Sequence, residues 1–499
     1  MTQATSPNFP SSGVKLYFSD FFEVPADEIK RYGAFNVSLV SDLPLFIDPF
    51  LLFNSRRPEY RQLHKDTIDY LRFLRQKSNN QRLEAGLVKA LYRFSEVNQN
   101  WLGFTEKGNR GRGLGTKFAM SLHKNLSRLF TNFGAESLTK GSHLEKLCLI
   151  EAGVRRDNIS DFTTNLIKEF LLQYTERFAK EFIPKNLRRK FSVQKVHFNY
   201  RTETWESRSF ELPCFHNDFV LLTPKKMLTR DKTWINREDL INDFDSLCDA
   251  IDNDELRAMV NNYLIKVLPE DPSSKQRHAA AAATIHKYPQ LIDEFIRQKE
   301  KEGRQAESVS SGKVKSSEKL YLEQFGKLVD LLEKRSKFYH VSGRTYAEAL
   351  QRVLFLKDII ENKGGHKLFY INGQPLRRET DAHILYRFTW FASPSDVSRE
   401  VNDGRGPADY KISRGSKDKS IVEFKLASNP QLERNLQHQT AIYEKASDAK
   451  RSIKAILFFS ESEHDRVTSI LRRLKLHGRE NVVLIDARSD NKPSGSKAA

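Results

Sequence analysis

The sequence lacks the paired cysteines that stabilise small secreted domains. Its 499 residues include only three cysteines, Cys148, Cys214 and Cys248, which lie far apart and form no CxxC pair. An odd number of widely spaced cysteines argues against both a disulfide framework and a structural zinc site. A reducing compartment fits this composition, so we expect a cytoplasmic protein.

The sequence also lacks a long apolar segment. No run approaches the roughly 18 consecutive apolar residues of a membrane-spanning helix. The first residues, MTQATSPNFPSSG, have no apolar core and do not resemble a signal peptide. We therefore expect no membrane partner. Apolar residues still make up 39% of the chain, with 34 phenylalanines, which is enough to build hydrophobic cores.

Acidic residues are too few to balance the basic ones. The formal net charge is +18, and the isoelectric point is about 9.5. An excess of this size attracts polyanions, and phosphate contacts from Lys and Arg dominate the binding of nucleic acids. Nucleic acid is thus the leading partner, and an incidentally basic surface is the alternative.

The chain is too long for one ordinary core, so we expect two or three domains. The segment KEKEGRQAESVSSGKVKSSEK is polar and contains no aromatic residue, which is typical of a linker or a solvated helix end. The sequence predicts a flexible tail at 1–13, a mixed α+β recognition or regulatory region at 14–298, a linker at 299–315, an α/β region at 316–488 and a disordered tail at 489–499.

The region 316–488 shows a clear order of elements. Two helices, a short strand and a third helix come first. Period-2 alternation then predicts a meander of three strands, followed by a helix, a strand, a helix and a final strand. The five strands are expected near residues 396–402, 408–413, 420–427, 453–459 and 481–487. Helices before and after the strands can cover both faces of one sheet, which makes this an α/β domain.

The strand SIVEFKLA carries charges within an apolar pattern. Side chains alternate across a strand, so Glu423 and Lys425 share one face while Val422 and Phe424 share the other. A carboxylate and an ammonium group on a central strand cost free energy unless they are used or paired. This pair is therefore a candidate for chemistry.

An aspartate on the preceding strand completes the candidate site. Asp409 lies in GRGPADYKIS, and the turn RGSKDK joins the two strands as a hairpin, so that Asp409 and Glu423 can approach each other. Two carboxylates at one point suit Mg²⁺ or Mn²⁺. Such an ion would activate water at a scissile phosphate. Lys425 would orient that water or stabilise the oxyanion.

The next helix adds polar residues to an apolar stripe. Leu432, Leu436, Gln439 and Tyr443 recur at helical spacing, and such a stripe should face the sheet. Gln439 and Tyr443 then need buried partners, which a phosphate, a metal-bound water or Lys425 would provide. The alternative is a helix edge with two half-exposed residues.

Three short motifs in this order resemble those of the PD-(D/E)xK nuclease superfamily. They are the PAD triplet that ends at Asp409, the EFK triplet that begins at Glu423, and the QTAIY segment from Gln439 to Tyr443. The last of these is similar to the QxxxY element of the RecB-like branch. The resemblance covers roughly residues 375–460.

The resemblance implies a restriction-endonuclease-like fold, in which helices flank a central mixed sheet. It also implies that Asp409 and Glu423 bind the metal and that Lys425 serves catalysis. Gln439 and Tyr443 would support the site and contact the substrate.

The superfamily also carries an acidic residue on a helix before the sheet, and here three residues compete. Asp381 projects onto the apolar face of its helix, whereas Glu379 projects away from it. Glu400 lies on a strand that leads towards the hairpin, although an ion pair with Arg399 or Arg405 would also explain it. We rank Glu400 and Asp381 equally and Glu379 third. Arg405, between two glycines, is a candidate phosphate ligand.

Polar residues of the first region have local explanations. Asp48 fits a turn before Pro49, and Asp161 fits an N-cap or first-turn acid of a helix. His143 has no metal-ligand spacing and is expected to be structural.

The function expected from these patterns is Mg²⁺-dependent cleavage of phosphodiester bonds. DNA is favoured over RNA by superfamily analogy, as is a role in restriction, anti-phage defence or DNA repair. The region 14–298 would recognise the substrate, a protein partner or a second copy of the chain. The alternatives are a non-catalytic nucleic-acid-binding protein that retains the fold and a regulatory interaction protein.

Overall fold

A computed structural model represents the chain. The residues that it describes, to which every structural statement below is confined, are 14–80, 84–103, 114–129, 136–150, 154, 156–341, 343–391, 396–398, 410–414, 418–437 and 452–492.

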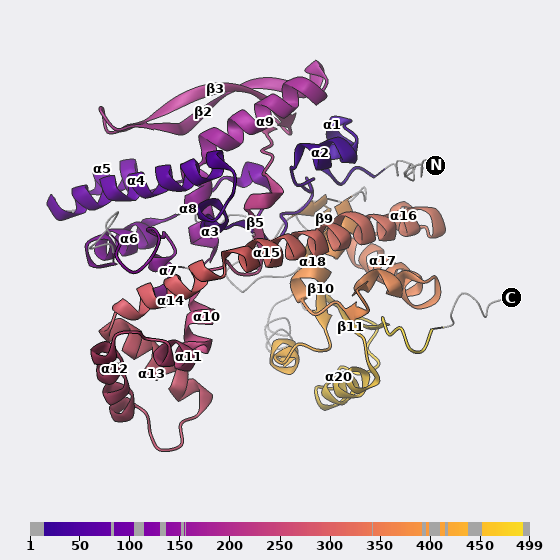
Figure 1. Cartoon of the computed structure of the whole chain (residues 1–499). Coiled ribbons are helices and arrows are strands. Elements are labelled where there is room, and N and C mark those ends of the chain that lie inside the picture. The colour runs from indigo at the N-terminus through magenta and orange to yellow at the C-terminus, as the bar shows by residue number, and fades with distance from the viewer. Residues whose placement is uncertain are drawn as a thin grey trace, which may run out of the picture.

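The C-terminal part is built on a five-stranded mixed sheet (Figure 1). Its strands, in spatial order, are β12 (Val482–Asp486), β11 (Ser452–Phe458), β10 (Asp418–Leu426), β9 (Tyr410–Arg414) and β8 (Asp396–Ser398). Strands β8, β9 and β10 form an antiparallel meander, and β10, β11 and β12 are mutually parallel. The α/β class predicted from the sequence is confirmed.

Helices cover both faces of this sheet. The helices of this part include α16 (Phe325–Arg335), α17 (Thr345–Asn362), α18 (Glu379–Phe391) and α20 (Glu461–Arg473). On one face Val422, Phe424 and Ile453 belong to the main hydrophobic core, which α17 and α18 complete. On the other face Ile456 packs with Val467 of α20 in a smaller core. The short strands β6 (Tyr370–Ile371) and β7 (Gln374–Pro375) precede α18.

The N-terminal part is mainly helical. Its helices are α1 (Phe18–Phe22), α2 (Ala26–Tyr32), α3 (Pro49–Phe53), α4 (Pro58–Asn80), α5 (Ala85–Leu87), α6 (Thr116–Leu129), α7 (Lys146–Ile150), α8 (Arg156–Leu166) and α9 (Lys168–Phe182). Its strands are β1 (Leu45–Ile47), β2 (Arg188–Asn199), β3 (Thr204–Phe215), β4 (Asp218–Phe219) and β5 (Leu228–Arg230). β1 pairs antiparallel with β5, and β2, β3 and β4 form a separate antiparallel sheet.

A helical lobe connects the two parts. It consists of α10 (Arg237–Asn242), α11 (Phe244–Asp249), α12 (Asp254–Val267), α13 (Ser274–Lys287) and α14 (Gln290–Lys301). Helix α13 begins with a capping box, in which the Ser273 hydroxyl accepts from the amide of Gln276. Among the described residues, no helix combines the length and the apolar character that a membrane span requires.

The segment 299–315, where the sequence predicts a linker or a solvated helix end, is helical in the structure. It comprises the end of α14 and most of α15 (Gly303–Ser317). The π-helical segment η5 (Glu318–Gln324) follows α15 and continues into α16 (Figure 1). Ser310 of α15 is buried, and its Oγ lies 3.3 Å from Thr229 Oγ1 on β5. The buried face of α15 consists mostly of small residues, which allow close approach to β5. Val314 is the largest apolar residue of that face, so the sequence pattern resembles a linker.

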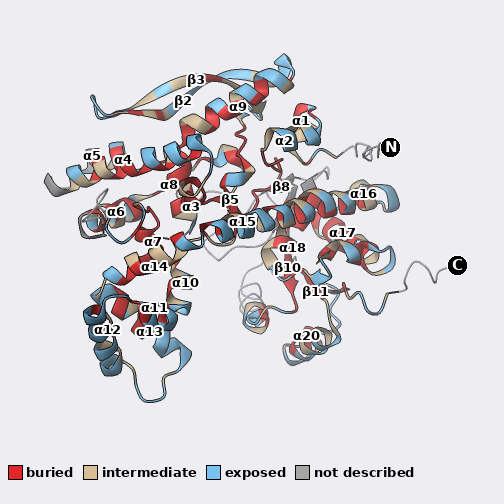
Figure 2. Cartoon of the chain, in the orientation of Figure 1, coloured by how far each residue is buried: buried red, intermediate tan, exposed pale blue. Residues whose placement is uncertain are grey.

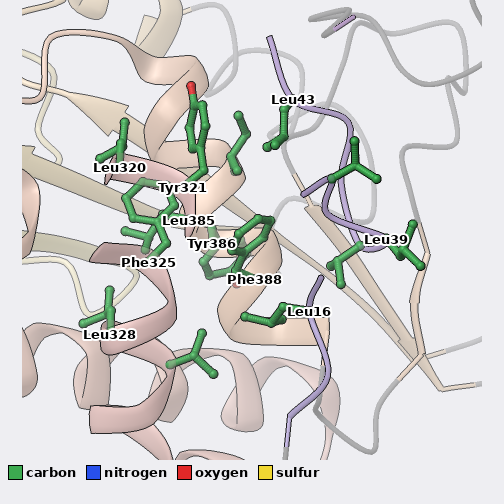
Figure 3. Packing of buried hydrophobic residues seen from close by; sticks show 14 of the residues in the cluster. Leu16, Leu39, Leu43, Leu320, Tyr321, Phe325, Leu328, Leu385, Tyr386 and Phe388 are labelled. Atoms are coloured by element: carbon green, nitrogen blue, oxygen red, sulfur yellow. The ribbon is translucent and has the colours of Figure 1, made fainter. Parts of the chain in front are cut away.

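One hydrophobic core extends across both parts of the chain. Leu16, Leu39 and Leu43 from the N-terminal part belong to the same cluster as Phe325 and Phe388. Figure 3 shows these side chains gathered around η5, α16 and α18. Figure 2 shows that buried segments continue through the middle of the molecule, where β5, α15 and α18 meet. The two parts therefore share apolar surface.

Candidate active site

Strand β10 carries the two predicted catalytic residues Glu423 and Lys425 on a buried face of the sheet. Their exposed fractions are 0% and 7%. Phe424 between them lies in the main core on the opposite face. Ile456, which is opposite Lys425 on β11, packs in the smaller core. The alternation expected from the sequence is present, and both charged residues lie on the side of α20.

The hairpin expected before this strand is formed by β9 and β10. Tyr410 pairs with Val422 at the end of β9, and Asp409 directly precedes Tyr410 in the chain. Asp409 itself lies outside the described residues, as do Glu400 and Arg405. The metal and phosphate contacts expected of these three residues stay predictions.

The helix that follows β10 lies over the face that carries Glu423. This segment is helical from Leu432, and Leu432 and Leu436 are buried in the smaller core. The first half of the predicted stripe therefore faces the sheet. Gln439 and Tyr443, its second half, lie outside the described residues.

The hydrogen bonds of the Asp381 carboxylate among the described residues are with side chains of β5 and η5. Its carboxylate accepts hydrogen bonds from Arg230 Nη2 of β5, at 2.7 and 2.8 Å, and from the Tyr321 hydroxyl at 2.5 Å. All three side chains are buried. Arg378, which directly precedes α18, forms an ion pair with Asp231. These contacts give Asp381 a structural role between β5 and α18, which the sequence pattern did not indicate.

Glu379, ranked third on sequence grounds, contacts the strand that carries Glu423. Its Oε1 accepts from the backbone amide of Leu426, at 3.3 Å, and from Asn429 Nδ2, at 2.7 Å. One turn later His383 Nε2 donates to the carbonyl of Phe424, at 3.1 Å. Glu379 and His383 therefore fix α18 against the backbone of β10. The apolar face of the helix, which favoured Asp381, does not reveal these backbone contacts.

A second buried lysine, which the sequence pattern did not indicate, lies on the neighbouring strand. Lys454 of β11 is the Cα partner of Glu423 in the parallel ladder. Its exposed fraction is 3%. The only sequence signal is a lysine within the apolar strand IKAILFF.

Buried acids also gather in the N-terminal part. Asp48 is the N-cap of α3, where Oδ1 accepts from the amide of Phe50 at 3.0 Å. Burial, together with the nearby Asp48, raises the pKa of Glu145 to about 8. Asp161 lies within α8 rather than at its N-terminus, so the expected capping role is wrong. Burial and the neighbouring Glu96 raise the pKa of Asp161 to about 8.

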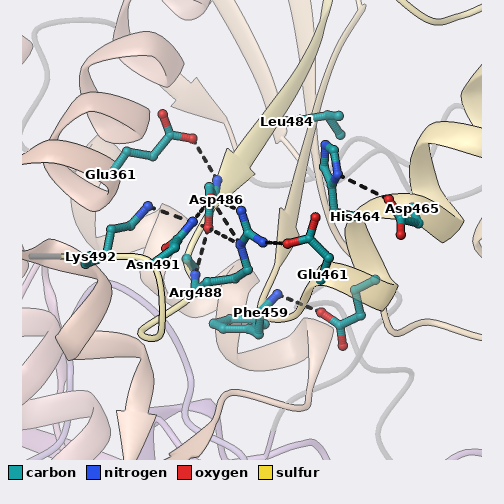
Figure 4. A network of polar contacts seen from close by, with 12 residues as sticks. Glu361, Phe459, Glu461, His464, Asp465, Leu484, Asp486, Arg488, Asn491 and Lys492 are labelled. Carbon is teal, nitrogen blue, oxygen red and sulfur yellow. Dashed lines mark hydrogen bonds and ion pairs between the residues drawn. The ribbon is translucent and has the colours of Figure 1, made fainter.

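Within the described part of the chain, Glu461, His464 and Asp465 form a group with the spacing of metal ligands. Other contacts explain this group, as Figure 4 shows: Glu461 pairs with Arg488, and His464 Nδ1 lies 3.7 Å from Asp465 Oδ1. Burial would raise the pKa of the adjacent Asp486, but hydrogen bonds, chiefly from Arg488, hold it at about 2. The group lies at an exposed helix start and does not include Glu423.

Comparison with known proteins gives two partial matches. The model of a domain of unknown function, DUF8370, matches residues 23–236. The model of a second domain of unknown function, DUF8371, matches residues 345–461, which include α18, Glu423 and Lys425. No curated protein and no solved structure matches the chain significantly.

Proposed function

We propose that the C-terminal part is a metal-dependent nuclease with its active site on β10. The observation that carries this proposal is the pair Glu423 and Lys425, buried side by side on the central strand of a mixed sheet. Burying two charged groups costs free energy, and a protein retains them where they are paired or used. The sheet order and the position of the pair are compatible with a restriction-endonuclease-like fold.

The donor atoms suit a hard divalent cation such as Mg²⁺ or Mn²⁺. Glu423 supplies a buried carboxylate, and we take Asp409, the residue before Tyr410 in the chain, as the source of a second one. Oxygen donors of this kind match the preference of both ions. When bound, the ion supplies water activation and neutralisation of phosphate charge. Glu400 and Glu379 are further candidates to complete this site.

The reaction adds water across a phosphodiester bond. The water oxygen forms a bond to phosphorus, and the ester P–O bond breaks. One water proton is released, and the leaving oxygen takes up a proton, so that a phosphomonoester and an alcohol result. The Lys425 ammonium group orients the water or stabilises the developing charge. Gln439 and Tyr443 position the site and the substrate, and Arg405 binds a phosphate.

DNA is the proposed substrate, and the net charge of +18 supports binding to a polyanion. The N-terminal part would recognise the substrate, a protein partner or a second copy of the chain. A role in anti-phage defence, restriction or DNA repair follows from the superfamily resemblance alone.

The test is cleavage of supercoiled plasmid DNA and of a labelled RNA by the full chain, with Mg²⁺ or with EDTA. We expect Mg²⁺-dependent cleavage that Glu423→Gln and Lys425→Met each reduce by at least about 1,000-fold. The control is Glu433→Gln, which alters a partly exposed glutamate paired with Arg473. Binding without cleavage in any metal would favour the non-catalytic alternative. Full activity of Glu423→Gln would show that the active site does not include Glu423.

A further inference from the structure

Four basic residues of the N-terminal part lie together where the ribbon of β2 and β3 meets a short π-helical segment, η1 (Val88–Tyr92). Lys89 lies within η1, and Arg93 directly follows it. Lys168 is the first residue of α9, over which the ribbon lies (Figure 1), and Lys195 belongs to β2. These four residues form what we call the basic cluster, and the candidate active site does not use them.

Lys195 lies at an irregular point of the ribbon. The register of β2 against β3 shifts there, and Lys195 has a φ of 51°. A lysine in this left-handed region is strained, so the surrounding contacts must hold it in place. The Lys195 Nζ donates to the carbonyls at the end of η1, those of Lys89, Ala90 and Arg93, at 3.2, 3.1 and 3.0 Å. The irregularity therefore fixes a positive charge against the end of η1.

Lys168 brings a further charge to the same place. Its Nζ donates to the carbonyl of Gln194, the residue before Lys195, at 2.8 Å. Burial and the charge of Lys195 lower the pKa of Lys168 to about 8. Burial, followed by the charges of Arg93 and Lys89, also lowers the pKa of Lys195. The other three cations are thus near enough to Lys195 to repel it.

Acidic side chains do not offset this charge. Among the described residues, no carboxylate forms an ion pair with a member of the basic cluster. Two acids close to it in the sequence are engaged elsewhere. Glu169 pairs with Arg208 of β3, and Glu96 lies near Asp42 and Asp157, which together with burial raise its pKa. The cluster therefore keeps an excess of positive charge.

We propose that the basic cluster binds the phosphate backbone of DNA, so that the N-terminal part holds the substrate. This inference rests on the proposed function only for the choice of DNA as the partner. Neighbouring phosphates present a row of negative charges, which several fixed cations contact at once. The net charge of +18 also favours a polyanion. Such contacts position a duplex without reading its sequence.

The four residues contribute in two ways. Lys168 and Lys195 are anchored by backbone carbonyls, which fixes the position of their charges. Lys89 and Arg93 are exposed, and neither side chain forms a hydrogen bond or an ion pair with another described residue. A purely structural role, in which Lys195 satisfies the last carbonyls of η1, gives this exposed pair no function. The exposed pair therefore provides the test, because its replacement should leave the fold intact.

The experiment measures anisotropy of a fluorescein-labelled DNA duplex with the full chain, over a range of salt concentrations and in EDTA to prevent metal-dependent cleavage. It compares Lys89→Gln/Arg93→Gln with the matched variant Lys275→Gln/Arg277→Gln, which removes the same two charges from exposed positions of α13. We expect the slope of log affinity against log salt to become shallower by about two for the cluster variant, since each lost phosphate contact releases about one counterion fewer. The matched variant should keep the wild-type slope, and both should melt at the wild-type temperature.

An equal slope for the cluster variant and the wild type would overturn the assignment, as would a wild type that binds no duplex at any salt concentration. Competition identifies the partner: polyglutamate or phosphatidylserine vesicles that displace the duplex at lower charge concentration than unlabelled DNA would show that DNA is the wrong partner. Plasmid cleavage is scored separately. A shallower slope in a chain that cleaves nothing in any metal would support this surface and refute the proposed nuclease.

Discussion

Glu145 shows how burial of a single residue makes stability depend on pH. This glutamate is fully buried. Burial, reinforced by Asp48, raises its pKa from 4.5 to about 8. Because the folded-state pKa lies above the unfolded one, the stabilisation is complete below the unfolded value and is lost as pH rises through about 8. Asp161, whose pKa is also raised to about 8, acts in the same direction.

We therefore predict that the melting temperature of the wild type falls from about pH 5 to about pH 8 and levels off above, and that the melting temperature of Glu145→Gln falls less. The amide stays neutral over this range, so the variant avoids the cost of a buried charge. Thermal melts in buffers across this range measure the effect. Glu270→Gln, at an exposed glutamate, is the control and should follow the wild type. An equally steep loss in Glu145→Gln and the wild type would show that Glu145 contributes nothing to the pH dependence.

At the scale of single elements, α18 connects the N-terminal part to the candidate site. Asp381 faces β5 through Arg230, whereas Glu379 and His383 face the backbone of β10. Residues 379 and 381 lie on opposite flanks of the first helical turn. The strand that carries Glu423 is therefore positioned by a helix that the N-terminal part holds in place.

Asp381→Asn should destabilise the protein by about 3–5 kcal/mol, because it leaves the buried Arg230 without its charged partner. Chemical denaturation measures this loss. Arg378→Ala removes a more exposed ion pair with Asp231 and should cost only about 0–1 kcal/mol. At a temperature where Asp381→Asn is folded, its Mg²⁺-dependent cleavage should persist. Stability like that of the wild type with abolished cleavage would instead make Asp381 a metal ligand.

At the scale of the whole molecule, the shared core determines how independent the two parts are. Leu16, Leu39 and Leu43 lie in the same cluster as residues of η5, α16 and α18. A fragment of residues 316–488 would lose these contacts and the Arg230 ion pair. Exposure of this apolar surface to water costs free energy in proportion to its area.

We predict that fragment 316–488 has a lower melting temperature than the full chain and binds a hydrophobic dye. Co-expression with fragment 14–298 should produce a complex with a single cooperative transition, since the missing core residues are then supplied. Calorimetry and dye fluorescence measure both outcomes. Equal stability of the isolated fragment and the full chain would contradict a shared core.

The alternation of polar and apolar residues along the sequence predicted the strands of the sheet. Contacts between segments that are distant in the sequence could not be predicted in this way. The alternation in SIVEFKLA placed Glu423 and Lys425 on one face, and the helical spacing of Leu432 and Leu436 identified the face that packs on the sheet. The position of Lys454 depends on the register between parallel strands, which a sequence pattern does not fix. The pairing of Arg230 with Asp381 joins distant segments and leaves no periodic signal.

We propose that Glu423 on β10 serves metal-dependent cleavage of DNA. The most direct measurement is the initial rate of plasmid cleavage over a Mg²⁺ titration, for the wild type and Glu423→Gln purified side by side. We expect a rate that saturates with Mg²⁺ for the wild type and a loss of at least about 1,000-fold for the folded variant at every concentration. Equal rates for the two proteins, or wild-type cleavage that persists in EDTA, would contradict it.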